Sequence, residues 1–163
     1  MTPIAVIGVV ILVLDQITKA VALRRLELGV AQPVVEGFFS LTLVLNPGLA
    51  FGMLAQTPPG WRWVVALLSL AALAVLFVLA RRVVPTGGVV GVLALGLVFG
   101  GAVGNLIDRA RFGAVVDFLD VHWRGHHWPA FNVADSAITV GVTLLAFRML
   151  FPPRAPEGPA PAR

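Results

Sequence analysis

The hydrophobic positions of this chain fall into long runs, separated by stretches in which polar residues, Pro and Gly gather. A membrane span needs about 20 mostly apolar residues. Four runs reach this length, and we predict transmembrane helices at residues 4–23, 61–80, 89–107 and 133–151. Ala20-Val21-Ala22 resembles a signal-peptide cleavage site. We nevertheless expect the first run to stay in the mature chain, because Asp15 and Lys19 interrupt it and Met-Thr-Pro before it carries no basic side chain.

A fifth run, Phe38–Gln56, is long enough to span but is broken by Asn46-Pro47-Gly48, a turn signal. Before the turn, apolar residues alternate with polar ones, which is the period of a strand. The apolar positions are Phe39, Leu41, Leu43 and Leu45. This segment therefore predicts a short sheet element outside the bilayer, then a turn, then a short amphipathic piece.

Composition agrees with a membrane protein. Hydrophobic residues make up 58% of the 163 residues and charged residues only 12%, whereas soluble domains carry about 25% charged residues. The net charge of +4 does not indicate nucleic-acid binding, because the basic residues are scattered. The lack of cysteine excludes disulfides, thiol catalysis and Cys-ligated metal. His122 and His126 are four residues apart, but Gly125 and Pro129 disfavour a regular helix there, so we predict no metal site.

Four spans place the end of the first span and loops 24–60 and 108–132 on one face of the membrane. Seven of the eight acidic residues then share that face. They are Asp15, Glu27, Glu36, Asp108, Asp117, Asp120 and Asp135. The positive-inside rule does not orient the chain, because Lys and Arg divide five to seven between the faces; Arg81-Arg82 is the best cytoplasmic marker.

Several polar residues lie in or beside the apolar runs, where charge is costly. Asp15 and Lys19 are spaced i,i+4 and either pair with each other or support a site. Glycines at 96, 100 and 104 predict a closely packed helix face. Asn105 and Arg109 continue a neighbouring stripe, and a buried guanidinium there would need carboxylate partners. Asp108 is expected to pair with Arg109 or Arg111.

The fourth run begins with four polar residues on one helix face: Asn132, Asp135, Ser136 and Thr139. Asn132 is a candidate N-cap and Asp135 a first-turn acid favoured by the helix dipole. Taken singly, Asp117 and Asp120 could be solvated loop acids. Taken together, the polar residues converge at one membrane face. Two carboxylates in a partly dry site cannot both ionise easily, so such a pair supplies an acid and a base for activating water.

Five blocks appear in an order that resembles the lipoprotein signal peptidases, also called signal peptidase II, a family of bacterial membrane aspartyl peptidases. They are DQITK at 15–19, NPGLAF at 46–51, GGAVGNLIDR at 100–109, GAVVDFLD at 113–120 and FNVADS at 131–136. The family commonly has Asn-x-Gly-Ala-Ala-Phe in the second block. Leu49 departs from that pattern, which affects loop detail rather than the proposed catalytic pair.

The resemblance implies an all-α polytopic membrane protein with four transmembrane helices, a small extracytoplasmic β-sheet cradle and a short interfacial helix in or after Ala50–Gln56. It implies that Asp117 and Asp135 are catalytic. It further implies two supporting sets: residues that shape the site or bind substrate, and structural supports. The first set is Asn46, Gly48, Asn105, Arg109 and Asn132, and the second is Asp15, Lys19 and Asp108. No metal or other cofactor is expected.

The implied function is a membrane aspartic endopeptidase that cuts diacylglyceryl-modified prolipoproteins just before the lipidated cysteine. It would lie in the bacterial inner membrane among membrane lipids, with both termini cytoplasmic and the active site on the extracytoplasmic face. A monomer suffices, because one chain holds every candidate residue. We expect one peptidase domain over 1–151 and a disordered Pro/Ala-rich tail over 152–163.

Two other functions fit a small membrane protein. A proton or ion transporter would also use intramembrane charge, but the acids here cluster at one face instead of stepping across the bilayer. A non-catalytic assembly subunit would explain the glycine face but not aspartates in separate motifs.

Overall fold

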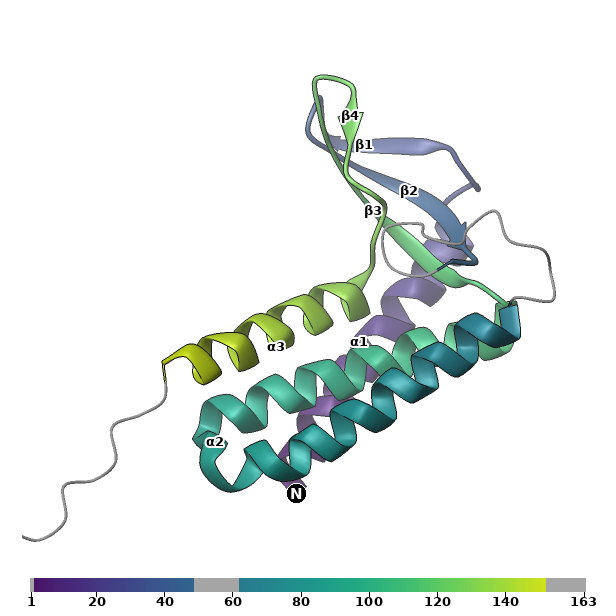
Figure 1. The fold of residues 1–163 in the computed structure, drawn as a ribbon. Coiled ribbons are helices and arrows are strands. Elements are labelled where there is room, and N and C mark those ends of the chain that lie inside the picture. The colour runs from purple at the N-terminus through teal and green to yellow at the C-terminus, as the bar shows by residue number, and fades with distance from the viewer. Residues whose placement is uncertain (1, 49–61, 152–163) are drawn as a thin grey trace, which may run out of the picture.

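The computed structural model describes residues 2–48 and 62–151, which form helices that meet a small sheet at one end (Figure 1). The helices are α1 (Thr2–Arg25), α2 (Arg62–Phe112) and α3 (Val133–Leu150). The strands are β1 (Ala31–Val35), β2 (Phe39–Asn46), β3 (Val115–Trp123) and β4 (His126–His127). They pair antiparallel in the order β1-β2-β3-β4. The label all-α is therefore too simple, because the sheet is a substantial part of the fold.

Helix α2 folds back on itself, so that its two arms run side by side (Figure 1). The reversal is at Gly88, where φ is 56° and ψ is −155°, a backbone conformation that favours glycine. The arms cover the second and third predicted spans. Among the described residues, two helical segments are long and apolar enough to cross a membrane, Pro3–Arg25 and Gly88–Phe112. The first arm of α2 and the whole of α3 are helical as predicted, and their crossing of the membrane stays a prediction.

The predicted strand at 39–46 is confirmed as β2, but its burial does not alternate as expected. Ser40 and Leu43 are buried while Leu45 is exposed. The reason is a register shift against β3 between Leu41 and Val44, which changes the faces that the following side chains occupy. The interfacial helix expected near Ala50–Gln56 lies outside the described residues.

The predicted glycine face is confirmed as a close contact between α2 and α1. A Cβ added at Gly100 would lie 2.5 Å from the Gly8 carbonyl oxygen, and one at Gly96 would lie 2.6 Å from Ile7 Cβ. On the neighbouring stripe, a Cβ at Gly101 would lie 2.5 Å from the Ala134 carbonyl oxygen of α3. Small residues on two faces of α2 therefore allow α1 and α3 to approach it closely.

Candidate active site

The site begins at the first turn of α3, which is closed by a capping box. Asn132 is the N-cap, as predicted, and its Oδ1 accepts a hydrogen bond from the Asp135 backbone N–H at 2.9 Å. In return, Asp135 Oδ2 accepts from the Asn132 backbone N–H at 3.3 Å. The cap thus fixes the Asp135 carboxylate at the positive end of the helix dipole.

Asp117 reaches the same cap from strand β3. Its Oδ1 accepts from Asn132 Nδ2 at 2.7 Å, and its Oδ2 accepts from Asn46 Nδ2 at 3.1 Å. Only 1% of Asp117 and none of Asn132 is exposed. One buried asparagine therefore contacts both candidate catalytic aspartates, which come from different elements.

Asn105 of α2 connects this pair to the helices below. Its Nδ2 donates to Asp135 Oδ1 at 2.8 Å. Its Oδ1 accepts from Lys19 Nζ at 2.9 Å and from Asn132 Nδ2 at 3.2 Å. Because the ammonium group can only donate, Lys19 fixes which end of the Asn105 amide faces Asp135.

Lys19 is itself held in a buried cluster of charges. Its Nζ lies 2.9 Å from Asp15 Oδ2 and 2.6 Å from Asp108 Oδ2. Asp15 Oδ1 accepts from the Ala134 backbone N–H at 3.0 Å, and Asp108 Oδ2 accepts from the Val116 N–H at 3.2 Å. The cluster therefore ties α1 and α2 to the backbone next to both candidate aspartates.

Two expectations about ion pairs were wrong. Asp108 pairs with Lys19 of α1, not with Arg109 or Arg111. Within the described ranges, Arg109 forms no ion pair with a carboxylate. Its Nη2 donates to the Gly48 carbonyl oxygen at 3.1 Å and its Nη1 to the Asn105 carbonyl oxygen at 3.4 Å. One carbonyl group in a loop and one in α2 therefore satisfy part of this guanidinium. Among residues 2–48 and 62–151, its buried Nε has no hydrogen-bond partner.

The turn after β2 is shaped by the same residues. Asn46 Oδ1 accepts from the Gly48 N–H at 3.0 Å, while its Nδ2 reaches Asp117. Arg109 binds the carbonyl group of the same glycine. The structure thus brings Asn46, Gly48, Asn105, Arg109 and Asn132 together around the two aspartates.

The electrostatics of Asp117 follow from its surroundings. Burial raises its pKa from the ordinary value of 3.8 to about 7, and the nearby charge of Asp135 adds to the rise. Hydrogen bonds from Asn46 and Asn132 and the charge of Lys19 oppose it. Asp117 is therefore close to half protonated at neutral pH, which suits a pair that shares one proton.

A pocket of about 190 Å³ opens beside Asp117. Its lining is mostly apolar: Val44, Leu45, Asn46, Pro47, Asp117, Pro129 and Ala130. The sequence gives no sign that Val44, Leu45, Pro129 and Ala130 line a pocket, because apolar residues in a strand and a loop carry no functional signal. The pocket lies where the turn after β2, at Pro47, meets the loop before α3, at Pro129 and Ala130. In the sequence, only the turn signal at Pro47 and the candidate N-cap Asn132 mark these two segments.

Asp120 has other partners, although it is buried in the same strand. It accepts from Thr42 Oγ1 at 3.0 Å and lies 2.8 Å from His127 Nδ1. The alternative that either Asp117 or Asp120 is a solvated loop acid does not hold, because both residues are buried. Over the described part of the chain, no cluster of three His, Asp or Glu side chains is arranged to hold a metal ion.

Solved structures with a similar fold indicate the class of protein. Two structures of a bacterial membrane enzyme, at 2.3 and 1.9 Å resolution, resemble this chain with TM-scores of 0.74 and 0.73 and 31% identity. The first comparison covers 92% of this chain and 88% of the other, and the second covers 94% and 96%. The fold is thus that of an integral membrane enzyme.

The family follows from the sequence comparisons. The model of the family described as signal peptidase (SPase) II matches residues 7–151. A lipoprotein signal peptidase of Geobacter metallireducens is 48% identical over 90% of this chain and 89% of its own length. One of Syntrophotalea carbinolica is 50% identical, with 85% of both chains covered. The chain belongs to the signal peptidase II family and is a protease.

Proposed function

We propose that this chain removes the signal peptides of prolipoproteins, cutting just before a cysteine that carries diacylglycerol, with Asp117 and Asp135 as the catalytic pair. Family membership supports the protease activity and the prolipoprotein substrate. The assignment of Asp117 and Asp135 as the catalytic pair is based on their shared contact with Asn132. This residue donates a hydrogen bond to Asp117 and caps the helix that carries Asp135. Two carboxyl groups are thereby held at one buried point next to an open pocket.

The chemistry follows from a pair that holds one proton. The ionised carboxylate takes a proton from water, and the resulting hydroxide attacks the carbonyl carbon of the peptide bond. The protonated carboxyl group donates to the carbonyl oxygen. When the tetrahedral intermediate collapses, the C–N bond breaks and a proton passes to the leaving amine of the cysteine. The pKa of about 7 for Asp117 keeps both forms available near neutral pH.

The surrounding residues have positioning roles in this proposal. Asn105 orients Asp135, and Asn46 orients Asp117. Arg109 and Gly48 hold the turn that carries Asn46. The buried charges of Asp15, Lys19 and Asp108 are structural supports, since they fix α1 and α2 relative to the site.

We further propose four membrane spans over one domain, residues 1–151, with both termini cytoplasmic and the site on the extracytoplasmic face of the inner membrane. Figure 1 supports an even number of crossings, because α2 begins and ends at the sheet while α1 starts and α3 ends away from it. The site then lies at the interface, where a lipid-anchored cysteine would present its peptide bond. All proposed site residues come from one chain, so a monomer suffices.

The test uses the purified chain with a diacylglyceryl-modified prolipoprotein and its unlipidated twin, followed by the mass shift on a gel. We expect cleavage of the lipidated form only, and no effect of a metal chelator. Failure of a well-folded preparation to cleave either form would contradict the proposal. Proton or ion flux in liposomes would then be the next measurement.

A further inference from the structure

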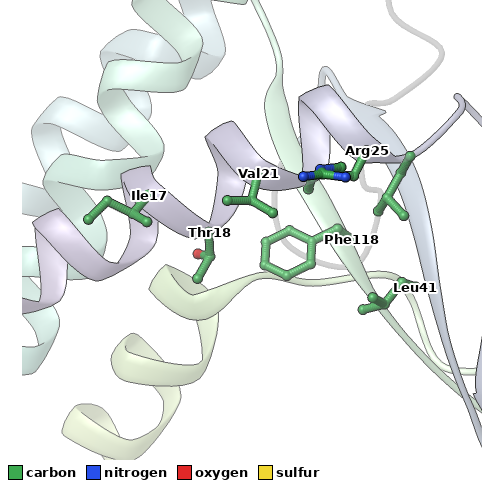
Figure 2. A pocket seen from close by; sticks show the side chains of 8 residues that line it. Ile17, Thr18, Val21, Arg25, Leu41 and Phe118 are labelled. Carbon is green, nitrogen blue, oxygen red and sulfur yellow. The ribbon is translucent and has the colours of Figure 1, made fainter.

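A second pocket, which we call the α1 groove, lies between the end of α1 and the sheet. Its volume is about 230 Å³. It is lined chiefly by Ile17, Val21, Ala22, Arg25, Leu41 and Phe118. Figure 2 shows the Phe118 ring between α1 and Leu41, beneath Val21. The groove is smaller than the roughly 300–1,000 Å³ of a pocket for a drug-sized ligand, so it has room for part of an extended chain.

The α1 groove is separate from the candidate active site. Successive side chains of a strand point to opposite faces. Asp117 bonds to Asn46 and Asn132, whereas Phe118 faces α1. A ligand in the groove would therefore lie on the other side of β3 from the proposed catalytic pair.

The groove opens onto the surface that meets lipid. Ile17 and Val21 are 56% and 53% exposed, and they continue a series of exposed apolar side chains along α1. Helix α1 is long and apolar enough to cross a membrane, and it ends at Arg24 and Arg25. The apolar floor, with Ala22 and Phe118 only 4% and 7% exposed, thus lies next to the hydrocarbon layer near its boundary with water.

Arg25 gives the groove a charge at the end of α1 (Figure 2). In the part of the chain that the structure describes, its guanidinium has neither a hydrogen bond nor an ion pair. The one other polar side chain in the lining, Thr18, donates its hydroxyl back to carbonyl groups of its own helix at 2.9 Å. The groove therefore combines an apolar trough with one available cation.

We propose that the α1 groove binds one anionic phospholipid, with part of an acyl chain along Val21 and Phe118 and the phosphate at Arg25. Charge complementarity selects this ligand. A guanidinium matches a phosphate with paired N–H donors, whereas the diacylglyceryl group of a substrate is uncharged and gives Arg25 no partner. Because Phe118 adjoins Asp117, the bound lipid would support the strand that carries the proposed catalytic residue.

Native mass spectrometry of the full chain in detergent tests this binding without any need for peptidase activity. The probes are dioleoylphosphatidylglycerol, dioleoylphosphatidylcholine and dioleoylglycerol. We expect a 1:1 complex in which phosphatidylglycerol binds about five-fold or more tightly than either other lipid. Five-fold corresponds to the ~1 kcal/mol typical of one basic residue near anionic lipid.

Two substitutions separate this site from general electrostatic attraction. Arg25→Gln is expected to abolish the preference for phosphatidylglycerol, whereas Arg24→Gln, the same charge change on the adjacent residue outside the groove, keeps it within two-fold. Val21→Phe narrows the trough and is expected to weaken phosphatidylglycerol binding at least three-fold. Equal losses in the two arginine variants, unchanged binding by Val21→Phe, or equal binding of dioleoylglycerol would each overturn the proposal.

Discussion

Replacing Asp117 with Asn should make the folded chain more tolerant of alkaline pH. Burial holds the pKa of Asp117 at about 7 in the folded state, against an ordinary value of 3.8. Between these values the unfolded chain has released the proton and the folded chain retains it, so stability falls as pH rises. The amide side chain of the variant has no such proton to release, and this part of the pH dependence should disappear in Asp117→Asn.

The magnitude follows from the size of the pKa difference. Each pKa unit is worth about 1.4 kcal/mol, so the range from pH 5 to pH 8 includes about 3 kcal/mol of destabilisation in the wild type. For a chain of this length, 1 kcal/mol moves the melting temperature by about 2–4 °C. The difference in melting temperature between the variant and the wild type should therefore grow by about 6–12 °C from pH 5 to pH 8.

Thermal unfolding in detergent at both pH values measures this difference. The new amide will face the Nδ2 groups of Asn46 and Asn132, and that cost is the same at each pH, so the change with pH is diagnostic. Asp120→Asn in the same strand is the control. Its partner His127 is 57% exposed, and such a pair is worth up to about 1 kcal/mol. If the difference in melting temperature between Asp117→Asn and the wild type were the same at pH 5 and pH 8, burial would not be what raises the pKa of Asp117.

Three further substitutions probe the network around the pair. Asn46→Ala removes a hydrogen bond that lowers the pKa of Asp117, so the limb of the kcat/KM profile that reports Asp117 should move to higher pH; a shift to lower pH would contradict this. Gly104→Ala places a Cβ against Asp15 Oδ2, which is buried and paired with Lys19, and should destabilise by about 1–3 kcal/mol in thermal unfolding; an unchanged melting temperature would contradict this. Lys19→Met leaves two buried carboxylates unpaired and should cost about 3–5 kcal/mol; a loss under about 1 kcal/mol, the worth of an exposed pair, would show that the pairing is not structural.

The features that sequence predicted well are those set by local chemistry. Asn132 is the N-cap of α3 because its short amide can bond to the N–H of Asp135 three residues later. The glycines at 96 and 100 contact α1 closely because only a residue without a side chain fits there. The pair Asp15–Lys19 forms on one helix face, as i,i+4 spacing dictates.

The features that sequence missed depend on how distant segments meet. Asp108 pairs with Lys19 because α1 crosses α2 at that level, which no spacing within α2 can show. Strand β3 was not predicted, because aspartates at 117 and 120 interrupt the two-residue alternation of a strand. Both carboxyl groups are nevertheless buried, each with partners on β2. Buried and exposed side chains do not alternate regularly along β2, and Ser40 is buried, because the pairing of β2 with β3 shifts register between Leu41 and Val44.

The most direct test of the catalytic assignment compares three aspartate variants on one lipidated prolipoprotein. The wild type, Asp117→Asn, Asp135→Asn and Asp120→Asn would each be purified, checked for folding by thermal unfolding, and followed for release of the signal peptide. We expect no detectable cleavage by Asp117→Asn or Asp135→Asn and measurable turnover by Asp120→Asn. Robust cleavage by either Asp117→Asn or Asp135→Asn would contradict it.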